Sequence, residues 1–268
     1  DTIPPSLALI TLGSVTGVSI SALFAAGLVP ALILAASLLV VIFLRSRGDK
    51  PPERKLDPRR IFSTFLKALP ALILPVFIRW AVVDGIATAT EVSTLGIAYA
   101  AIIGIVLYRP VEWRRIYPAL VETAALSGAI LFVIGAATSV AWALTQSGFS
   151  ANLVTFMTAV PGGAAGFMAI TIVVFVLLGN VLEGLPAILL FAPMLLPVAQ
   201  SFGIPEVHYG IVVIVAMSIG LFSPPFGVGF YSACVIGRVN PDDAIGPVWK
   251  YLGAIFLALL VVAATPWL

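Results

Sequence analysis

The sequence alternates long apolar segments with short polar ones. Neither residues 2–44 nor residues 123–182 contain a charged side chain. A helix of about 20 mainly apolar residues is long enough to cross the hydrocarbon core of a bilayer. The segments that we expect to form membrane helices are 22–44, 61–83, 92–107, 119–144, 167–182, 187–202 and 246–268. The pattern therefore predicts an all-α, polytopic transmembrane protein.

Basic residues gather in the polar segments and orient the predicted helices. Segment 45–60 contains seven Lys or Arg residues, and a second basic group consists of Arg109, Arg114 and Arg115. Loops rich in Lys and Arg lie on the cytoplasmic side of a membrane, so we expect both groups there. The uncharged segment 146–163 is expected to be a loop on the outer face.

Composition narrows the class of protein. Of the 268 residues, 61% are hydrophobic and 10% charged, with a net charge of +2 and a mean hydropathy of +1.15. This weak charge, confined to loops, gives no reason to expect a nucleic-acid partner. The single cysteine, Cys234, excludes an internal disulfide and a cysteine-based metal cluster. Without a phosphate-binding loop or a hydrolytic residue set, we expect no enzyme and no cofactor, and transport would use an ion gradient or a partner.

Residues 220–229 interrupt an apolar segment. Two adjacent prolines remove two backbone donors, and glycines on both sides let the chain leave helical geometry. Broken backbone at membrane depth survives only where protein or a water-filled cavity covers it. The stretch therefore predicts a broken helix whose ends bind small ions and anionic groups; a proline kink without a ligand is the alternative. The candidate residues are Gly220, Ser223, Pro224, Pro225, Phe226 and Gly227.

A second Pro-Pro pair occurs near the start, in Ile3-Pro4-Pro5-Ser6. Pro5 is followed twelve residues later by Gly17, and Pro225 is followed twelve residues later by Gly237. Each unit then continues through a small turn into a long apolar helix. The common layout indicates an internal repeat, as in many transporter folds.

Residues 179–186 separate two apolar arms. We expect the arms to form a re-entrant hairpin, although two full spans would give the same topology. Glu183 is ionisable and lies within apolar sequence, which makes it a candidate for function; a position in interfacial water is the alternative. The other candidates at this tip are Gly179, Asn180 and Gly184.

Two hydroxyls and a carboxylate precede the helix predicted at 92–107. Thr90 can cap this helix, which is expected to begin near Glu91. Capping and ion binding are both open for Thr88, Thr90 and Glu91. The preceding segment, 61–83, is interrupted by basic residues and prolines, so it either crosses the membrane or lies partly along its surface.

Two further polar residues have predicted structural roles. His208, the only histidine, is expected to be structural or interfacial. Asn240 precedes Pro241 and two acidic residues, so it is expected to cap the last helix.

Several motifs occur in order along nearly the whole chain. They are Ile3-Pro4-Pro5-Ser6 with Gly13 and Gly17, Gly85-Ile86-x-Thr88-x-Thr90-Glu91, Leu178-Gly179-x-x-Leu182-Glu183-x-x-Pro186-Ala187, Pro193-x-Leu195-Leu196-Pro197, Gly203-Ile204-x-x-x-His208-x-Gly210 and Gly220-x-x-Ser223-Pro224-Pro225-x-Gly227. Each motif is weak by itself, but the set is specific. The chain resembles the large membrane subunit of tripartite ATP-independent periplasmic (TRAP) transporters.

The resemblance implies an elevator-type transporter with two inverted repeats, each with a re-entrant hairpin and a broken helix. It implies sodium-driven uptake of an organic acid, such as a C4-dicarboxylate or sialic acid, across the bacterial inner membrane. The implied partners are a small four-helix membrane subunit, a periplasmic substrate-binding protein and the lipid bilayer.

In the family, sodium lies between hairpin tips and broken helices. The matching positions here are Gly179, Gly220, Ser223 and Phe226, where Ser223 replaces the threonine that the family commonly has. Ser6 and Gly13 are the candidates in the first repeat.

The resemblance also predicts a division of the chain. Residues 1–18 are the remnant of the first broken helix, 19–163 are scaffold helices with the basic loop, 164–237 hold the hairpin and the second broken helix, and 238–268 form a C-terminal membrane helix. The first and third parts would move as a transport domain. Because the chain begins at Asp1 with the repeat under way, we expect it to be the C-terminal part of a longer protein, without the first hairpin.

Two alternatives stay open. One is a related carboxylate permease of the same superfamily that works without a binding protein, for which Glu183 is the candidate for proton coupling. The other is a membrane enzyme or a purely structural subunit, which would need converging catalytic groups that the sequence does not display.

Overall fold

The computed structural model consists almost entirely of helices. It describes residues 2–3, 5–48, 57–107, 112–159, 161–182 and 184–266. Within these ranges there is no β-strand, and seven helical segments are long and apolar enough to cross a membrane. The prediction of an all-α, polytopic membrane protein is therefore confirmed.

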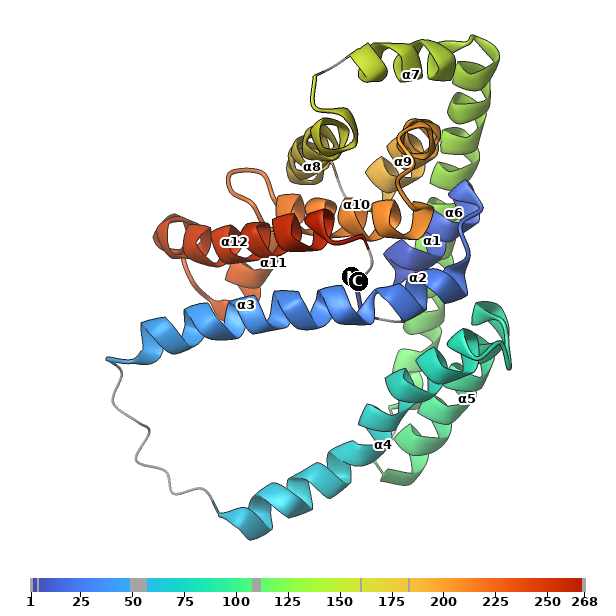
Figure 1. The fold of residues 1–268 in the computed structure, drawn as a ribbon. Helices are drawn as coiled ribbons and strands as arrows, with labels where there is room; N and C mark the ends of the chain where they lie inside the picture. Colours follow the sequence, from blue (N-terminus) through green and yellow to red (C-terminus); the bar gives the residue numbers. More distant parts are fainter. Residues whose placement is uncertain are drawn as a thin grey trace. The chain divides into compact units, whose positions relative to one another are not determined.

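Figure 1 shows the order of the helices along the chain. In chain order they are α1 (Leu7–Thr16), α2 (Ile20–Ala26), α3 (Leu28–Ser46), α4 (Pro58–Val83), α5 (Ala89–Leu107), the 3-10 turn η1 (Trp113–Arg115), α6 (Ile116–Gln146), α7 (Phe149–Ala159), α8 (Gly163–Val181), α9 (Gly184–Ser201), α10 (Glu206–Leu221), α11 (Val228–Gly237) and α12 (Pro241–Ala264).

One expectation about elements was confirmed and one was wrong. The helix predicted at 22–44 is present within the apolar helical segment Ile20–Ser46, in which α2 and α3 meet at Gly27. Gly27 lets the Thr2 carbonyl approach closely, since that carbonyl lies where a Cβ of residue 27 would stand. The loop predicted at 146–163 contains the helix α7, which packs on α9. Gly148 and Gly162, both with positive φ, make the turns at its two ends. The absence of charge in this segment therefore indicated an apolar helix rather than a loop.

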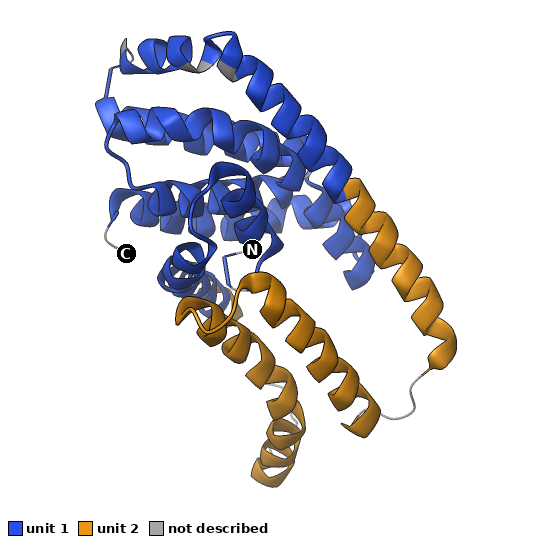
Figure 2. Ribbon diagram, turned by 90° about the vertical axis from the view of Figure 1, so that its right-hand side faces the viewer, with its two compact units in different colours: residues 1–44, 130–268 blue, residues 45–129 orange. Residues whose placement is uncertain are grey.

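The chain forms two compact units, residues 1–44 with 130–268 and residues 45–129 (Figure 2). Both segments that are predicted to move, 1–18 and 164–237, belong to the first unit. Packing in one structure does not report motion, so the division into transport and scaffold parts stays a prediction.

The core of the first unit is α10. Every residue from His208 to Gly220 except Ser218 is buried. This helix contacts α1, α2, α8, α9, α11 and α12, and Figure 1 shows it among these elements. An apolar helix without a polar face is stable only when it is covered on all sides, which explains this central position.

Two side chains near the start of α10 anchor it to its neighbours. The Tyr209 ring stacks on Phe167 of α8, with centroids 5.9 Å apart. His208 Nε2 donates to the Ala263 carbonyl of α12 at 3.2 Å. This contact agrees with the structural role expected for His208.

In the second unit, α4 packs on α5. The Tyr99 hydroxyl donates to the Pro70 carbonyl at 2.9 Å. Helix α4 continues through Pro70 and Pro75 and has the length and apolarity of a membrane span. Both alternatives for this segment, a membrane crossing and a position along the membrane surface, therefore stay predictions.

Candidate functional site

The predicted broken helix is present. Helix α10 ends at Leu221, α11 begins at Val228, and residues 222–227 connect them in turns that include a cis Pro224–Pro225 peptide. The break is shorter than the stretch 220–229, because Gly220 lies in the last turn of α10 and Gly229 in the first turn of α11.

Ser223 lies at the centre of the break and is buried. Its amide donates to the Gly220 carbonyl at 2.9 Å, and its carbonyl accepts from the Gly227 amide at 3.0 Å. Its hydroxyl donates to the Ile219 carbonyl at 2.8 Å. The hydroxyl proton is thereby occupied, and the lone pairs of Oγ can face a cation.

Three carbonyl groups of the break have no donor. Within the described ranges, no hydrogen bond is made to the carbonyl oxygens of Phe222, Pro224 and Phe226. A carbonyl without a partner is costly inside a membrane protein. Carbonyl oxygens are also the groups that hold sodium at broken transporter helices. Phe222 and Phe226 are exposed and Pro224 is buried. The break therefore offers carbonyl oxygens of the type that a hard cation binds, as candidate ligands.

The end of α8 lies against this break. Both α8 and α9 have the length and apolarity of a membrane span, so the re-entrant hairpin stays a prediction beside two full spans. Gly179 and Asn180 belong to the last turn of α8, at the end of the arm predicted at 167–182, and Gly184 is the first residue of α9. Glu183 lies outside the described residues. The Phe226 amide donates to Asn180 Oδ1 at 3.2 Å, which joins the hairpin to the break.

Gly179 and Gly220 allow the backbones of α8 and α10 to touch. A Cβ on Gly179 would overlap the Met217 carbonyl, and a Cβ on Gly220 would overlap the Val176 carbonyl. The two glycines are therefore required for close packing, whatever their part in ion binding. Sequence reasoning treated them as ligand candidates and as residues that interrupt regular helix, and it did not predict this packing contact.

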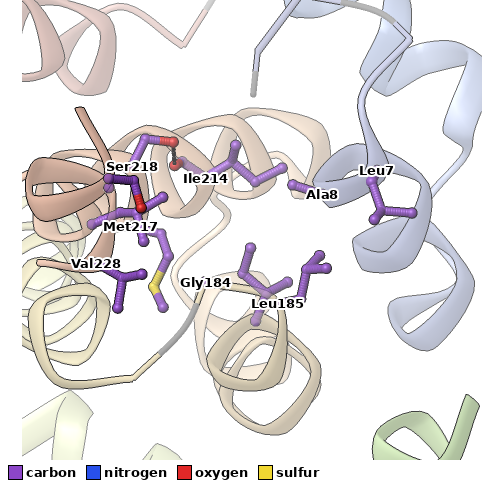
Figure 3. A pocket seen from close by; sticks show the side chains of 12 residues that line it. Leu7, Ala8, Gly184, Leu185, Ile214, Met217, Ser218 and Val228 are labelled. Carbon is purple, nitrogen blue, oxygen red and sulfur yellow. Dashed lines mark hydrogen bonds between the residues drawn. The ribbon is translucent and has the colours of Figure 1, made fainter. Parts of the chain in front are cut away.

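A cavity of about 340 Å³ lies beside the break. It is lined by Leu7, Ala8, Gly184, Leu185, Ile188, Ile214, Met217, Ser218, Leu221, Val228, Gly229 and Ser232. Figure 3 shows residues of α1, α9, α10 and α11 around it, with the Ser218 hydroxyl donating to the Ile214 carbonyl at 2.8 Å. The first turns of α1, α9 and α11 thus contribute to one space, and no Lys or Arg is among the described residues that line it.

The sequence did not reveal this cavity. Each helix N-terminus has amides without intrahelical partners and about half a unit of positive charge. Three helix ends beside one cavity are therefore a candidate site for a negatively charged group. The local signal was the start of each helix, but only folding brings the three starts together.

The first-repeat candidates have structural roles. Ser6 caps α1, because its Oγ accepts from the Leu9 amide at 3.3 Å. A Cβ on Gly13 would lie 2.6 Å from Ile20 Cγ1, so Gly13 permits the tight turn into α2. Neither residue lines the cavity. Helices α1 and α11 each have 10 residues and each contribute their first turn to the cavity, which agrees with the internal repeat.

The other three candidate residues, Thr88, Thr90 and Glu91, lie in the second unit. Thr88, rather than Thr90, caps α5: the Glu91 amide donates to Thr88 Oγ1 at 3.3 Å, and the Thr88 amide donates to Glu91 Oε2 at 2.8 Å. This reciprocal pair is a capping box. The expectation that Thr90 is the cap was wrong by two positions, because the helix begins at Ala89.

Comparison with known proteins identifies the family. The profile of the family described as "Tripartite ATP-independent periplasmic transporter, DctM component" matches residues 1–268. The chain belongs to the DctM family. It is therefore related to transporter permease subunits, not to enzymes.

Three relatives of this DctM-family chain have named substrates. It is 27% identical over 265 residues to the 2,3-diketo-L-gulonate TRAP transporter large permease protein YiaN of Escherichia coli, covering 98% of this chain and 62% of the relative. The C4-dicarboxylate large permease protein DctM of Pseudomonas aeruginosa is 29% identical with the same two coverages. The sialic acid large permease protein SiaM of Vibrio cholerae is 27% identical, also with the same coverages.

The DctM-family chain spans about three fifths of the length of the curated relatives that it matches. The match to large permease proteins confirms the resemblance seen in the motifs. It does not test the individual site residues, which stay predictions.

Proposed function

We propose that this chain is part of a TRAP-type permease that uses a sodium gradient to take up an organic acid delivered by a periplasmic binding protein. The observation that carries the proposal is the broken helix α10–α11, with free carbonyls at its break and a cavity lined by helix N-termini beside it.

Sodium would bind at the break. Its ligands would be Ser223 Oγ and the carbonyls of Phe222, Pro224 and Phe226, all of them the hard oxygen donors that such a cation prefers. The carbonyl end of α8, where Gly179 lies, adds a partial negative charge nearby. Gly220 contributes by letting α8 approach.

The substrate would bind in the cavity with its carboxylate at the N-termini of α1, α9 and α11. The ends of three helices offset one to two negative charges at about half a charge each. Diketogulonate, C4-dicarboxylate and sialic acid, named for three relatives, are all organic acids. This common chemistry supports an organic acid here, and the aliphatic lining supports a guest with apolar carbon next to its acid group.

The coupling would arise because the two sites share elements. The first turn of α11 lines the cavity, and the break lies directly before it. Sodium that orders the break would therefore order one of the anion-binding helix ends, so each ligand would raise the affinity for the other. The proposed partners are a small four-helix membrane subunit and a periplasmic binding protein, in a bacterial inner membrane.

Uptake in proteoliposomes tests the proposal. The large subunit carrying this sequence is reconstituted with the small subunit and the binding protein, and uptake of radiolabelled organic acids is measured with and without an inward sodium gradient. We expect uptake only with the gradient and the binding protein. Uptake without the binding protein, driven by a proton gradient, would instead support the stand-alone permease coupled through Glu183.

A further inference from the structure

The peptide group between Pro225 and Phe226 is held at both of its polar atoms. Its amide, on Phe226, donates to Asn180 Oδ1 at 3.2 Å. Its carbonyl, on Pro225, accepts from the Tyr231 hydroxyl at 2.7 Å. Asn180 belongs to the last turn of α8, and Tyr231 belongs to α11. We call Asn180, Tyr231 and this peptide group the peptide clamp.

The clamp restricts the orientation of the break. A peptide group is planar, so hydrogen bonds to its oxygen and to its nitrogen restrict how the whole plane can turn. The proline ring fixes φ of Pro225 as well. The Pro224 carbonyl belongs to the preceding peptide plane and the Phe226 carbonyl to the following one, so each is joined to the clamped plane through a single Cα. Both are among the carbonyls without a donor.

The clamp also determines which carbonyls of the break are hydrogen-bonded and which are not. The Pro225 carbonyl already accepts a strong hydrogen bond, which leaves its neighbours on either side for a ligand. Ion sites need ligands held in position before the ion arrives, because ordering them on binding costs affinity. Two side chains on one peptide achieve this.

We propose that Asn180 and Tyr231 are positioning residues that set the geometry of the sodium-binding carbonyls and tie it to the α8–α9 hairpin. The inference rests on the sodium site of the proposed function. A movement that takes the end of α8 away from the break would remove the acceptor of the Phe226 amide and weaken the ion site. The state of the hairpin and sodium affinity are thereby coupled.

The clamp is separable from the packing of the hairpin. The backbones of α8 and α10 already touch at Gly179 and Gly220. Asn180 is half-buried and Tyr231 is exposed. Truncating either side chain should therefore leave the helices in contact and the protein assembled.

The test uses N180L, N180D and Y231F in the reconstituted transporter with its partners. The measurements are the sodium concentration for half-maximal uptake and the KM for the acid at saturating sodium. We expect N180L and Y231F each to raise the half-maximal sodium concentration about three- to tenfold, the effect of one lost hydrogen bond, with KM changed less than about twofold. N180D keeps an acceptor oxygen, so its value should equal that of the wild type or fall below it.

Matched controls separate the clamp from general effects. N152L changes an exposed asparagine of α7, and Y117F changes an exposed tyrosine of α6; both should leave the sodium requirement unaltered. Because both clamp residues act on one peptide, the double variant N180L/Y231F should show less than the product of the two single effects.

If the wild type is sodium-dependent, either of two results would overturn the clamp. In the first, N180L and Y231F have the same half-maximal sodium concentration as their control variants. In the second, N180D raises that concentration as much as N180L does. If N180L does not assemble, Y231F decides, since it removes one oxygen from an exposed side chain. A wild type that takes up acid without sodium would overturn the proposed function first and the clamp with it, so the two failures are distinguishable.

Discussion

Ser223 gives the break its one side-chain oxygen among backbone carbonyls. Its hydroxyl proton is used by the Ile219 carbonyl, so Oγ can accept or ligate but does not donate elsewhere. The same hydrogen bond, from a serine hydroxyl to the carbonyl four residues earlier, also occurs inside ordinary helices, so only the surroundings of Ser223 differ. Ser139 of α6 makes the same bond to the carbonyl four residues earlier, at 2.9 Å, and is exposed.

This comparison supports a prediction at the residue scale. S223A should raise the half-maximal sodium concentration for uptake roughly tenfold, as expected for loss of an oxygen that contacts a charged group. S223T keeps a hydroxyl oxygen, so its half-maximal sodium concentration should equal that of the wild type. S139A is the control and should have no effect. Sodium titration of uptake measures all three, and an S223A transporter with an unchanged requirement would remove this side chain from the ligand set.

At the scale of elements, the contact of α8 with α10 depends on two glycines. G179A and G220A would each push a methyl group into a backbone carbonyl, where no flexible side chain can yield. We expect each change to destabilise the protein by about 1–3 kcal/mol and to lower its melting temperature in detergent. G253A in α12, with open space around its Cα, is the control and should be neutral or stabilising. Equal melting temperatures for all three variants would contradict the contact.

The start of α5 gives a second prediction for an element. T88A removes the capping box with Glu91 and should cost about 1 kcal/mol of stability. T90A should cost less, because Thr90 lies inside the first turn. Thermal unfolding measures the difference. An increased sodium requirement in T88A without loss of stability would instead favour the ion-binding alternative for these residues.

Sequence reasoning succeeded where the signal was local. The pair Pro224–Pro225 removes donors wherever it stands, so the break was predictable, and Asn240 caps α12 as expected, accepting from the Asp242 amide at 3.3 Å. Sequence reasoning failed where a contact joins residues that are far apart in the sequence. Nothing near Asn180 in the sequence indicates that its side chain meets the Phe226 amide.

Predictions that depend on where a helix begins or ends were only partly correct. The capping of α5 was expected, but Thr90 was chosen over Thr88 because both hydroxyls precede the same apolar run. Helix α7 was missed because an uncharged segment between two spans was taken for a loop. The seven candidate spans were predictable because apolar length is a property of the sequence itself.

At the scale of the whole molecule, the first unit brings together the break, the end of α8 and the cavity. In the proposed function these sites would have opposite preferences, oxygen ligands for a cation and helix N-termini for a carboxylate. Their shared element, the start of α11, would then couple a sodium gradient to acid uptake. The central claim is therefore that sodium and acid enter together.

The most direct test is the simultaneous uptake of radiolabelled sodium and radiolabelled organic acid in proteoliposomes with the assembled transporter and its binding protein. We predict that acid accelerates sodium entry, that sodium accelerates acid entry, and that S223A weakens both. Acid uptake that continues at the same rate when sodium is replaced by choline, with no acid-dependent sodium entry, would contradict the account.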